Sequence, residues 1–184
     1  MSDSVSLILD TDIGDDVDDA FALAQAALHP SIDLVAVTTC WGDTVARARL
    51  AGRVLTAAGR DRVPIHPGPN TSLTTGDRVV TQMTSGRGHI PSEVHLRVQD
   101  AVDYLVETVL SAPGEYTLCA VGPLTNVAHA IRRDWRFASA LAGLVVMGVR
   151  LAGGGEGEYN FRCDLAAAEV VLQSDANLRI GPID

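Results

Sequence analysis

Short apolar runs alternate with amphipathic segments along most of the chain, and this alternation constrains the fold more than any other feature. The apolar runs are continuous and rich in β-branched residues, as in 32–39, which is typical of strands buried on both faces. Strands are predicted at 5–9, 32–39, 63–66, 116–121, 144–147 and 178–180. Such strand–helix alternation predicts an α/β fold with a mostly parallel sheet and helices on both faces.

Segments with helical periodicity follow most of the predicted strands. Helices are predicted at 18–28, 44–58, 98–110, 124–132 and 164–173. Residues 67–95 lose this periodicity and are rich in Gly, Pro, Ser and Thr, so we predict a long surface excursion there. No internal repeat or linker divides the sequence, and residues 1–184 are therefore predicted to form a single domain.

The charge balance and the cysteine usage exclude several classes of partner. The 184 residues include 14 basic and 23 acidic side chains, which argues against binding to nucleic acid or to an anionic membrane. The three cysteines are scattered and show no metal-ligand spacing, which is typical of reduced thiols. The first ten residues lack the basic flank of a signal peptide, and the longest apolar stretch is too short to cross a bilayer. We therefore expect a cytoplasmic protein.

The residues after each strand are the candidates for a ligand site, because ligands of parallel sheets bind outside the carboxyl ends of the strands. Six aspartates follow the first strand: Asp10, Asp12, Asp15, Asp16, Asp18 and Asp19. Ionised carboxylates this close repel one another, and a hard cation such as Ca²⁺ or Mg²⁺ relieves the repulsion. The alternative is a solvated acidic turn that also caps the next helix.

Polar groups also follow three later strands. Asp43 is either a ligand-site residue or the N-cap of the next helix. Val121 precedes a Gly-Pro sequence, which either frees a strand-end carbonyl oxygen for a cation or is a simple turn from the strand into the next helix. Glu158 and Asn160 alternate in sequence, so both could face one side and bind hydroxyl groups. Asp164 is interpreted as the N-cap of the last predicted helix.

Four motifs, in order along the chain, resemble those of the calcium-dependent nucleoside hydrolases of the inosine–uridine-preferring type. The family opens with D-x-D-x-G-x-D-D-A, matched here by 10–14 and then 18–20 with two residues inserted between them. The other motifs are GPLTN at 122–126, VVMG at 145–148 and EYNFRCD at 158–164. The resemblance runs from residue 7 to the end and implies a nucleoside-hydrolase-like fold with a Rossmann-like core.

The resemblance implies hydrolysis of the N-glycosidic bond of ribonucleosides to ribose and free base, in purine or pyrimidine salvage. It implies that Asp12 and Asp19 ligate Ca²⁺ through carboxylates and that Val121 does so through its main-chain oxygen. Asp12 would also be the base that acts on a calcium-bound water. The residues implied to bind the ribose hydroxyls are Asp18, Glu158 and Asn160.

Two departures from the family pattern give further expectations. Asp43 stands where the family usually has Asn, so the resemblance makes it a substrate-binding residue that brings an extra carboxylate, while Asp10 supports the loop from behind. The family's C-terminal region, with a further Asp ligand and in many members a His acid, has no match in the sequence. We therefore expect a domain that is C-terminally incomplete relative to the family, with His89 and His95 as candidate acids. Apolar surface left uncovered in this way predicts a homo-oligomer.

Two other classes of function remain open. A catalytically inactive nucleoside- or ribose-binding protein would retain the same carboxylates, and only turnover would separate it from an enzyme. A phosphatase-like metal hydrolase shares the opening Asp10-Thr-Asp12, and release of phosphate would identify it. That class is the weaker alternative, because the sequence has no lysine and no second Asp pair after a later strand.

Overall fold

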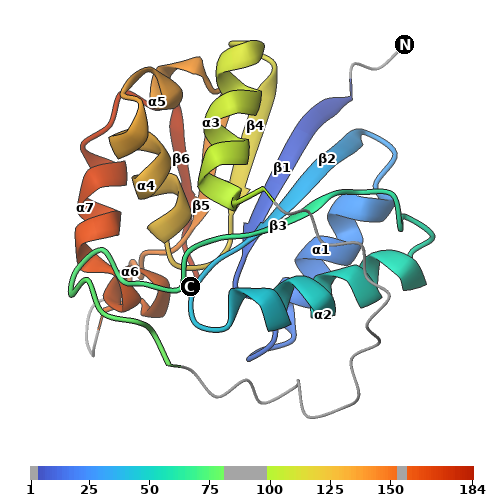
Figure 1. Ribbon diagram of the computed structural model, residues 1–184, viewed down its shortest axis with the longest axis horizontal. Helices are drawn as coiled ribbons and strands as arrows, with labels where there is room; N and C mark the ends of the chain where they lie inside the picture. The colour runs from blue at the N-terminus through green and yellow to red at the C-terminus, as the bar shows by residue number, and fades with distance from the viewer. Residues whose placement is uncertain (1–3, 81–98, 153–156) are drawn as a thin grey trace.

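The computed structural model describes residues 4–80, 99–152 and 157–184, and within them six strands form one sheet (Figure 1). The strands are β1 (Val5–Thr11), β2 (Ile32–Thr39), β3 (Ile65–Pro67), β4 (Tyr116–Ala120), β5 (Gly143–Met147) and β6 (Leu178–Gly181). Their order is β3-β2-β1-β4-β5-β6, and every pairing is parallel. This confirms the predicted α/β fold with a parallel sheet.

Seven helices lie in the described ranges and connect these strands. They are α1 (Asp18–Leu28), α2 (Thr44–Ala57), α3 (Ala101–Ser111), α4 (Thr125–Arg133), α5 (Arg136–Ala140), α6 (Tyr159–Cys163) and α7 (Leu165–Leu172). The sequence did not predict α5 and α6, because five residues are too few to show helical periodicity. The third strand lies one to two residues later than predicted, and it includes Pro67, which an edge strand tolerates.

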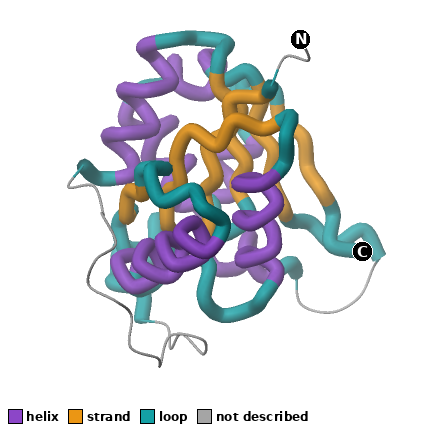
Figure 2. The backbone as a smooth tube through the Cα atoms, turned by 90° about the vertical axis from the view of Figure 1, so that its right-hand side faces the viewer, coloured by secondary structure: helices purple, strands orange, loops and turns teal. Residues whose placement is uncertain are grey.

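Helices cover both faces of the sheet (Figure 2). Side chains of alternate strand residues pack in two separate cores, one on each face. On β1, Leu7 and Leu9 pack in one core with residues of α1 and α2. Ile8 points the other way and packs in a second core with residues of α3, α4, α5 and α7. Because side chains of a strand alternate between faces, a continuous apolar run is what a sheet covered on both sides requires.

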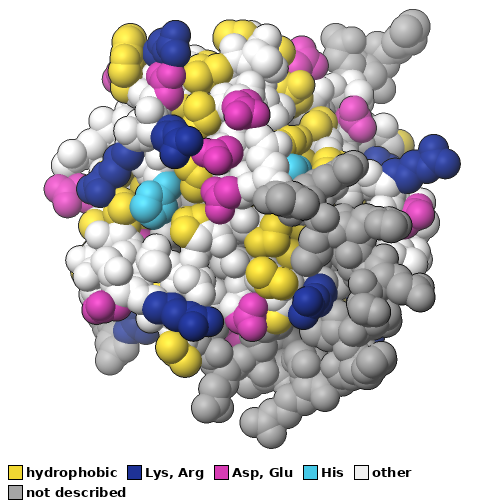
Figure 3. Space-filling view, in the orientation of Figure 1, with side chains coloured by type: hydrophobic (Ala, Val, Ile, Leu, Met, Phe, Trp, Pro, Cys, Tyr) yellow, Lys and Arg dark blue, Asp and Glu magenta, His cyan; other side chains and the backbone are white. Residues whose placement is uncertain are grey.

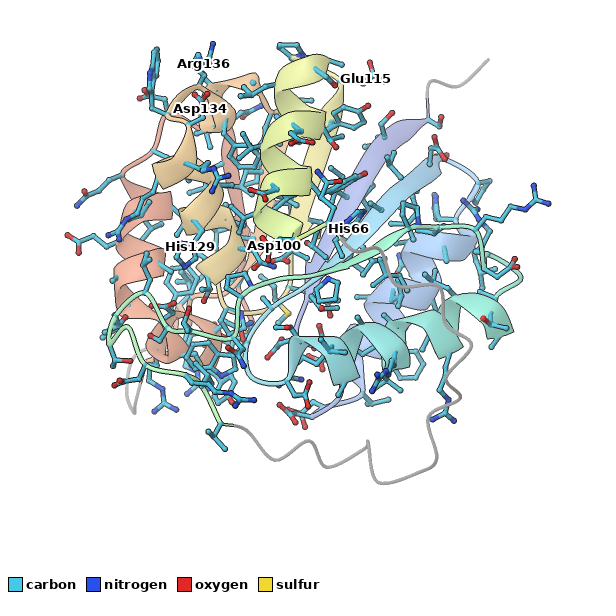
Figure 4. The ribbon with its side chains drawn as sticks, in the orientation of Figure 1. His66, Asp100, Glu115, His129, Asp134 and Arg136 are labelled. Atoms are coloured by element: carbon cyan, nitrogen blue, oxygen red, sulfur yellow. The ribbon has the colours of Figure 1, made fainter. Side chains whose placement is uncertain are left out.

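Charged side chains are interspersed over the face that α3 and α4 present to the viewer in Figure 3. Arg133 of α4 pairs there with Asp103 of α3 at 2.8 Å. Asp134 and Arg136, which pair at 2.6 Å, lie with Glu115 at the upper end of the molecule (Figure 4), beyond the amino ends of the strands. The carboxyl ends of the strands therefore open at the lower end of this view.

Two further sequence expectations bear on the described residues. Cys40, Cys119 and Cys163 are all free thiols; Cys40 is buried and the other two are half-buried. Within the described ranges, no helix is both long and apolar enough to span a membrane. The second half of the predicted excursion, including His89 and His95, lies outside the described residues.

Candidate active site

A cavity of about 620 Å³ lies at the carboxyl ends of β1, β4 and β5. The strand order reverses between β1 and β4, and this is the point at which open α/β sheets form their ligand crevice. Six carboxylates line the cavity: Asp12, Asp15, Asp16, Asp18, Asp19 and Glu158. The cavity is therefore an acidic cup built from loops that follow different strands.

Asp12 follows β1 and Asp19 lies in the first turn of α1, and these two aspartates are only 7% and 8% exposed. Thr11 donates its hydroxyl to the Asp19 carboxylate and accepts a hydrogen bond at 3.1 Å from the amide of Ile13. Burial, and then the nearby charge of Asp19, raise the pKa of Asp12 to about 8. Burial likewise raises the pKa of Asp19 to about 6. Two buried carboxylates thus face one cavity, and both favour a cationic neighbour.

Asp10 lies directly behind this pair and is fully buried. Its carboxylate accepts hydrogen bonds from Thr38 Oγ1 at 2.6 Å and from Asn126 Nδ2 at 2.7 Å. Asn126 also donates to the carbonyl oxygen of Thr39 at 3.1 Å. Burial outweighs these hydrogen bonds and raises the pKa of Asp10 to about 6. Asp10 therefore connects β1, β2 and the start of α4 behind the cup.

The opposite wall of the cup comes from α6 and from the end of β4. Glu158 is the N-cap of α6, and its carboxylate accepts from the amides of Asn160 and Phe161, both at 2.9 Å. Asn160 donates from Nδ2 to the carbonyl oxygen of Val121 at 2.9 Å. Glu158 and Asn160 lie at the start of a helix, which the sequence did not predict. Both side chains nevertheless line the cavity.

Asp43 and Asp164 have local roles in the structure. Asp43 caps α2 by accepting from the amide of Ala46 at 3.0 Å, and it is not among the residues that line the cavity. Asp164 stands at the N-cap position of α7, but its side chain makes no capping hydrogen bond, so that part of the interpretation was wrong. It accepts instead from the amide of Leu73 at 2.8 Å and from Thr125 Oγ1 at 2.7 Å.

The structure therefore brings together most of the predicted site residues. Those that line the cavity are Asp12, Asp18, Asp19, Val121, Glu158 and Asn160. Within the described ranges, no three His, Cys, Asp or Glu side chains form a group that could hold a metal ion by themselves. Sequence reasoning missed Arg47, a fully buried arginine that pairs with Asp15 at 2.8 Å, because an arginine in a helix ordinarily indicates a solvated surface.

The fold and the site define an α/β protein with a carboxylate-lined cup at the switch point of a parallel sheet. Residues 7–184 match the family of inosine-uridine preferring nucleoside hydrolases, and the chain belongs to that family. Members of this family are generally metal-dependent. This membership confirms the resemblance and favours it over the phosphatase-like alternative.

Individual relatives agree with the family assignment. The chain is 33% identical to uridine nucleosidase 1 of Arabidopsis thaliana over 95% of its own length and 55% of that protein's. Its structure is similar to that of a plant nucleoside hydrolase, with a TM-score of 0.86, 31% identity and coverage of 97% of this chain and 60% of the other. An inosine-guanosine nucleoside hydrolase gives a TM-score of 0.82 at 27% identity, covering 96% of this chain and 61% of the other. The chain thus spans little more than half the length of these relatives.

Proposed function

We propose that the protein hydrolyses the N-glycosidic bond of ribonucleosides to give ribose and a free base. The observation that carries this proposal is the convergence of Asp12, Asp18, Asp19, Glu158 and Asn160 on one cavity in a member of the nucleoside hydrolase family. Cleavage of a glycosidic bond passes through an oxocarbenium-like transition state. A cup of fixed carboxylates stabilises the positive charge that develops on the sugar.

The donors in the cup fit a calcium ion. Asp12 and Asp19 would hold it through their carboxylates and Val121 through its main-chain oxygen, and hard cations such as Ca²⁺ prefer oxygen donors of these kinds. The burial of both carboxylates supports this assignment, because buried charges require an opposite charge nearby. When bound, the ion would lower the pKa of a coordinated water.

The residues of the cup have two proposed roles, proton transfer and binding of the sugar. Asp12 would accept the proton of the attacking water, since its carboxylate lines the cavity beside the proposed calcium site. Asp18, Glu158 and Asn160 would bind the ribose hydroxyls from two sides of the cup. We retain Asp43 as a proposed substrate-binding residue, although its carboxylate is occupied as a helix cap.

The test is product analysis with uridine and inosine as substrates, because the relatives are named for these nucleosides. We expect equal amounts of ribose and free base, and loss of both in Asp12→Asn. Asp33→Asn is the matched control, since Asp33 is an exposed carboxylate near the amino end of β2. Nucleoside binding without either product would contradict the proposal and would favour the inactive binding protein.

The remaining expectations are also proposals. We propose that the chain self-associates, because Leu165, Leu172 and Ile180 are large apolar side chains that are 60%, 49% and 37% exposed. Light scattering on the purified protein tests this, and a monomeric mass would contradict it. A salvage role in the cytoplasm would follow from the proposed products, ribose and a reusable base, and localisation of a tagged protein would test the compartment.

A further inference from the structure

Arg47 of α2 is the largest fully buried side chain in the described residues, with no exposed surface. Its Nε donates to the carbonyl oxygen of Trp41 at 2.6 Å. Its Nη1 donates to the carbonyl oxygens of Asp12 and, at 3.1 Å, of Ile13. Its Nη2 pairs with the Asp15 carboxylate at 2.8 Å. One guanidinium therefore connects the loop after β1 with the loop after β2.

Burying a charge is costly unless its donors are satisfied, so a buried arginine with this many partners indicates a specific geometric role. One of the loops that it connects is strained. Trp41 has a φ of 62°, in the left-handed region that side chains other than glycine rarely adopt. The hydrogen bond from Arg47 to the Trp41 carbonyl holds that residue in place. The planar fork of an arginine holds five donors in a fixed geometry, whereas a lysine offers three donors on one nitrogen at the end of a flexible stem.

We infer that Arg47 is a positioning residue that fixes the main chain of Asp12 and Ile13 and so aims the Asp12 carboxylate into the cavity. Arg47 is not among the residues that line the cavity, and it acts through the backbone of a residue that does. The effect of Arg47 on the calcium site rests on the proposed function. Its effect on how rigidly the loop after β1 is held does not.

A positioning role and a purely electrostatic role predict opposite changes in calcium affinity. The positive charge of Arg47 lies beside the acidic cup, so removing the charge alone makes the cup more negative and strengthens its attraction for a cation. Removing the fork lets Asp12 move, and this weakens the site. Replacement of residues that orient metal ligands typically costs roughly 10–100-fold in metal affinity.

The variants are Arg47→Met, which removes charge and fork, and Arg47→Lys, which keeps the charge and loses the fork. Arg60→Met is the matched control, because Arg60 donates to the carbonyl oxygen of Ala27 at 2.9 Å, away from the cavity. Calcium chloride is titrated calorimetrically into each folded protein. Hydrogen–deuterium exchange of the peptide covering residues 10–17 is measured without calcium.

We expect calcium affinity to fall at least about tenfold in Arg47→Met and to fall also in Arg47→Lys, with Arg60→Met unchanged. Hydrogen–deuterium exchange in residues 10–17 should rise in Arg47→Met and in Arg47→Lys, and should not change in Arg60→Met. Unchanged exchange, or calcium affinity in Arg47→Lys equal to that of the wild type, would overturn the inference, and Arg47→Lys decides the matter if Arg47→Met does not fold. A wild-type protein that binds no calcium would overturn the proposed function, and the exchange result would still decide the role of Arg47.

Discussion

The side-chain amide of Asn160 donates to the carbonyl oxygen of Val121 at 2.9 Å and so connects the start of α6 to the end of β4. Both residues line the acidic cup. The hydrogen bond orients the carbonyl oxygen that we propose as a calcium ligand. Two walls of the cup that are 39 positions apart in the chain are thereby held in one arrangement.

Replacement of Asn160 by Ala should therefore affect both stability and the site. The Val121 carbonyl would lose its donor in a buried position, which costs about 1–3 kcal/mol in the free energy of unfolding. Calcium affinity should fall roughly 10–100-fold. Urea denaturation and calorimetry measure the two effects. Asn177→Ala is the control, because the Asn177 amide also donates to a main-chain carbonyl oxygen, that of Ala142, outside the cup. Equal calcium affinities in the two variants would contradict the proposed role of Asn160 at the calcium site.

Replacement of Gly122 by Ala tests whether the Asp12 carboxylate needs the space that the missing Cβ leaves free. A Cβ atom at this position would lie 2.6 Å from Asp12 Oδ1 and 2.9 Å from Cys40 Sγ, so Gly122→Ala must displace the carboxylate. We expect nucleoside turnover to be lost, with a destabilisation of about 1–3 kcal/mol from overpacking. Gly143→Ala is the control, since its nearest neighbours would lie 3.9 Å away. Full activity in Gly122→Ala would show that Asp12 does not need this position.

Asp164 gives a prediction about pH. Burial would raise its pKa, but hydrogen bonds from Leu73, Thr74 and Thr125 outweigh burial and hold the pKa below the ordinary value of 3.8. A carboxylate with a lowered folded-state pKa stabilises the fold above the unfolded pKa, and this contribution is lost as the pH falls through the folded pKa. Asp164→Asn should lower the free energy of unfolding by about 2 kcal/mol or more at pH 7, because both carboxylate oxygens accept hydrogen bonds and the NH2 group that replaces one of them can only donate.

The difference between the wild type and Asp164→Asn should narrow below about pH 4, where the Asp164 carboxyl of the unfolded chain begins to be protonated, and should continue to narrow as the pH falls through the lowered pKa of the folded protein. Urea denaturation between pH 7 and pH 3 measures it. A difference of constant size across that range would mean that ionisation of Asp164 does not contribute.

Two substitutions of Asp43 separate its role as the helix cap of α2 from its proposed role in binding substrate. Asp43→Ala removes the cap of α2 and should lower the free energy of unfolding by about 1 kcal/mol, while Asp43→Asn retains an accepting oxygen and should be nearly as stable as the wild type. Thermal unfolding measures both. Equal stability of all three proteins would contradict the capping role. A changed KM in Asp43→Asn would place this carboxylate at the sugar.

The sequence predicts the sheet well because strands buried on both faces must be apolar throughout, as Leu7, Ile8 and Leu9 are. It predicts the cup because the ends of parallel strands meet at one edge, which brings Asp12 and Val121 together. Both inferences use only local pattern and the geometry of parallel sheets.

The sequence does not predict contacts that depend on packing between distant segments. The partners of Asp164 include Leu73, which is 91 positions away, so the sequence predicts the position of Asp164 at the start of α7 but not the contacts of its side chain. The burial of Arg47 follows from where α2 packs against the loop after β1, and its position in the helix carries no sign of that packing. Residues of this kind require the structure.

Turnover of 4-nitrophenyl β-D-ribofuranoside tests directly whether the acidic cup is a calcium-dependent ribohydrolase site. It is measured for the wild type and for Asp12→Asn, with and without added calcium. Nitrophenolate leaves without protonation, so the assay depends on the carboxylates of the cup and not on a leaving-group acid. We expect calcium-dependent release of nitrophenolate that is abolished in Asp12→Asn. A folded wild-type protein that releases none, or release that persists in Asp12→Asn, would contradict the proposed function.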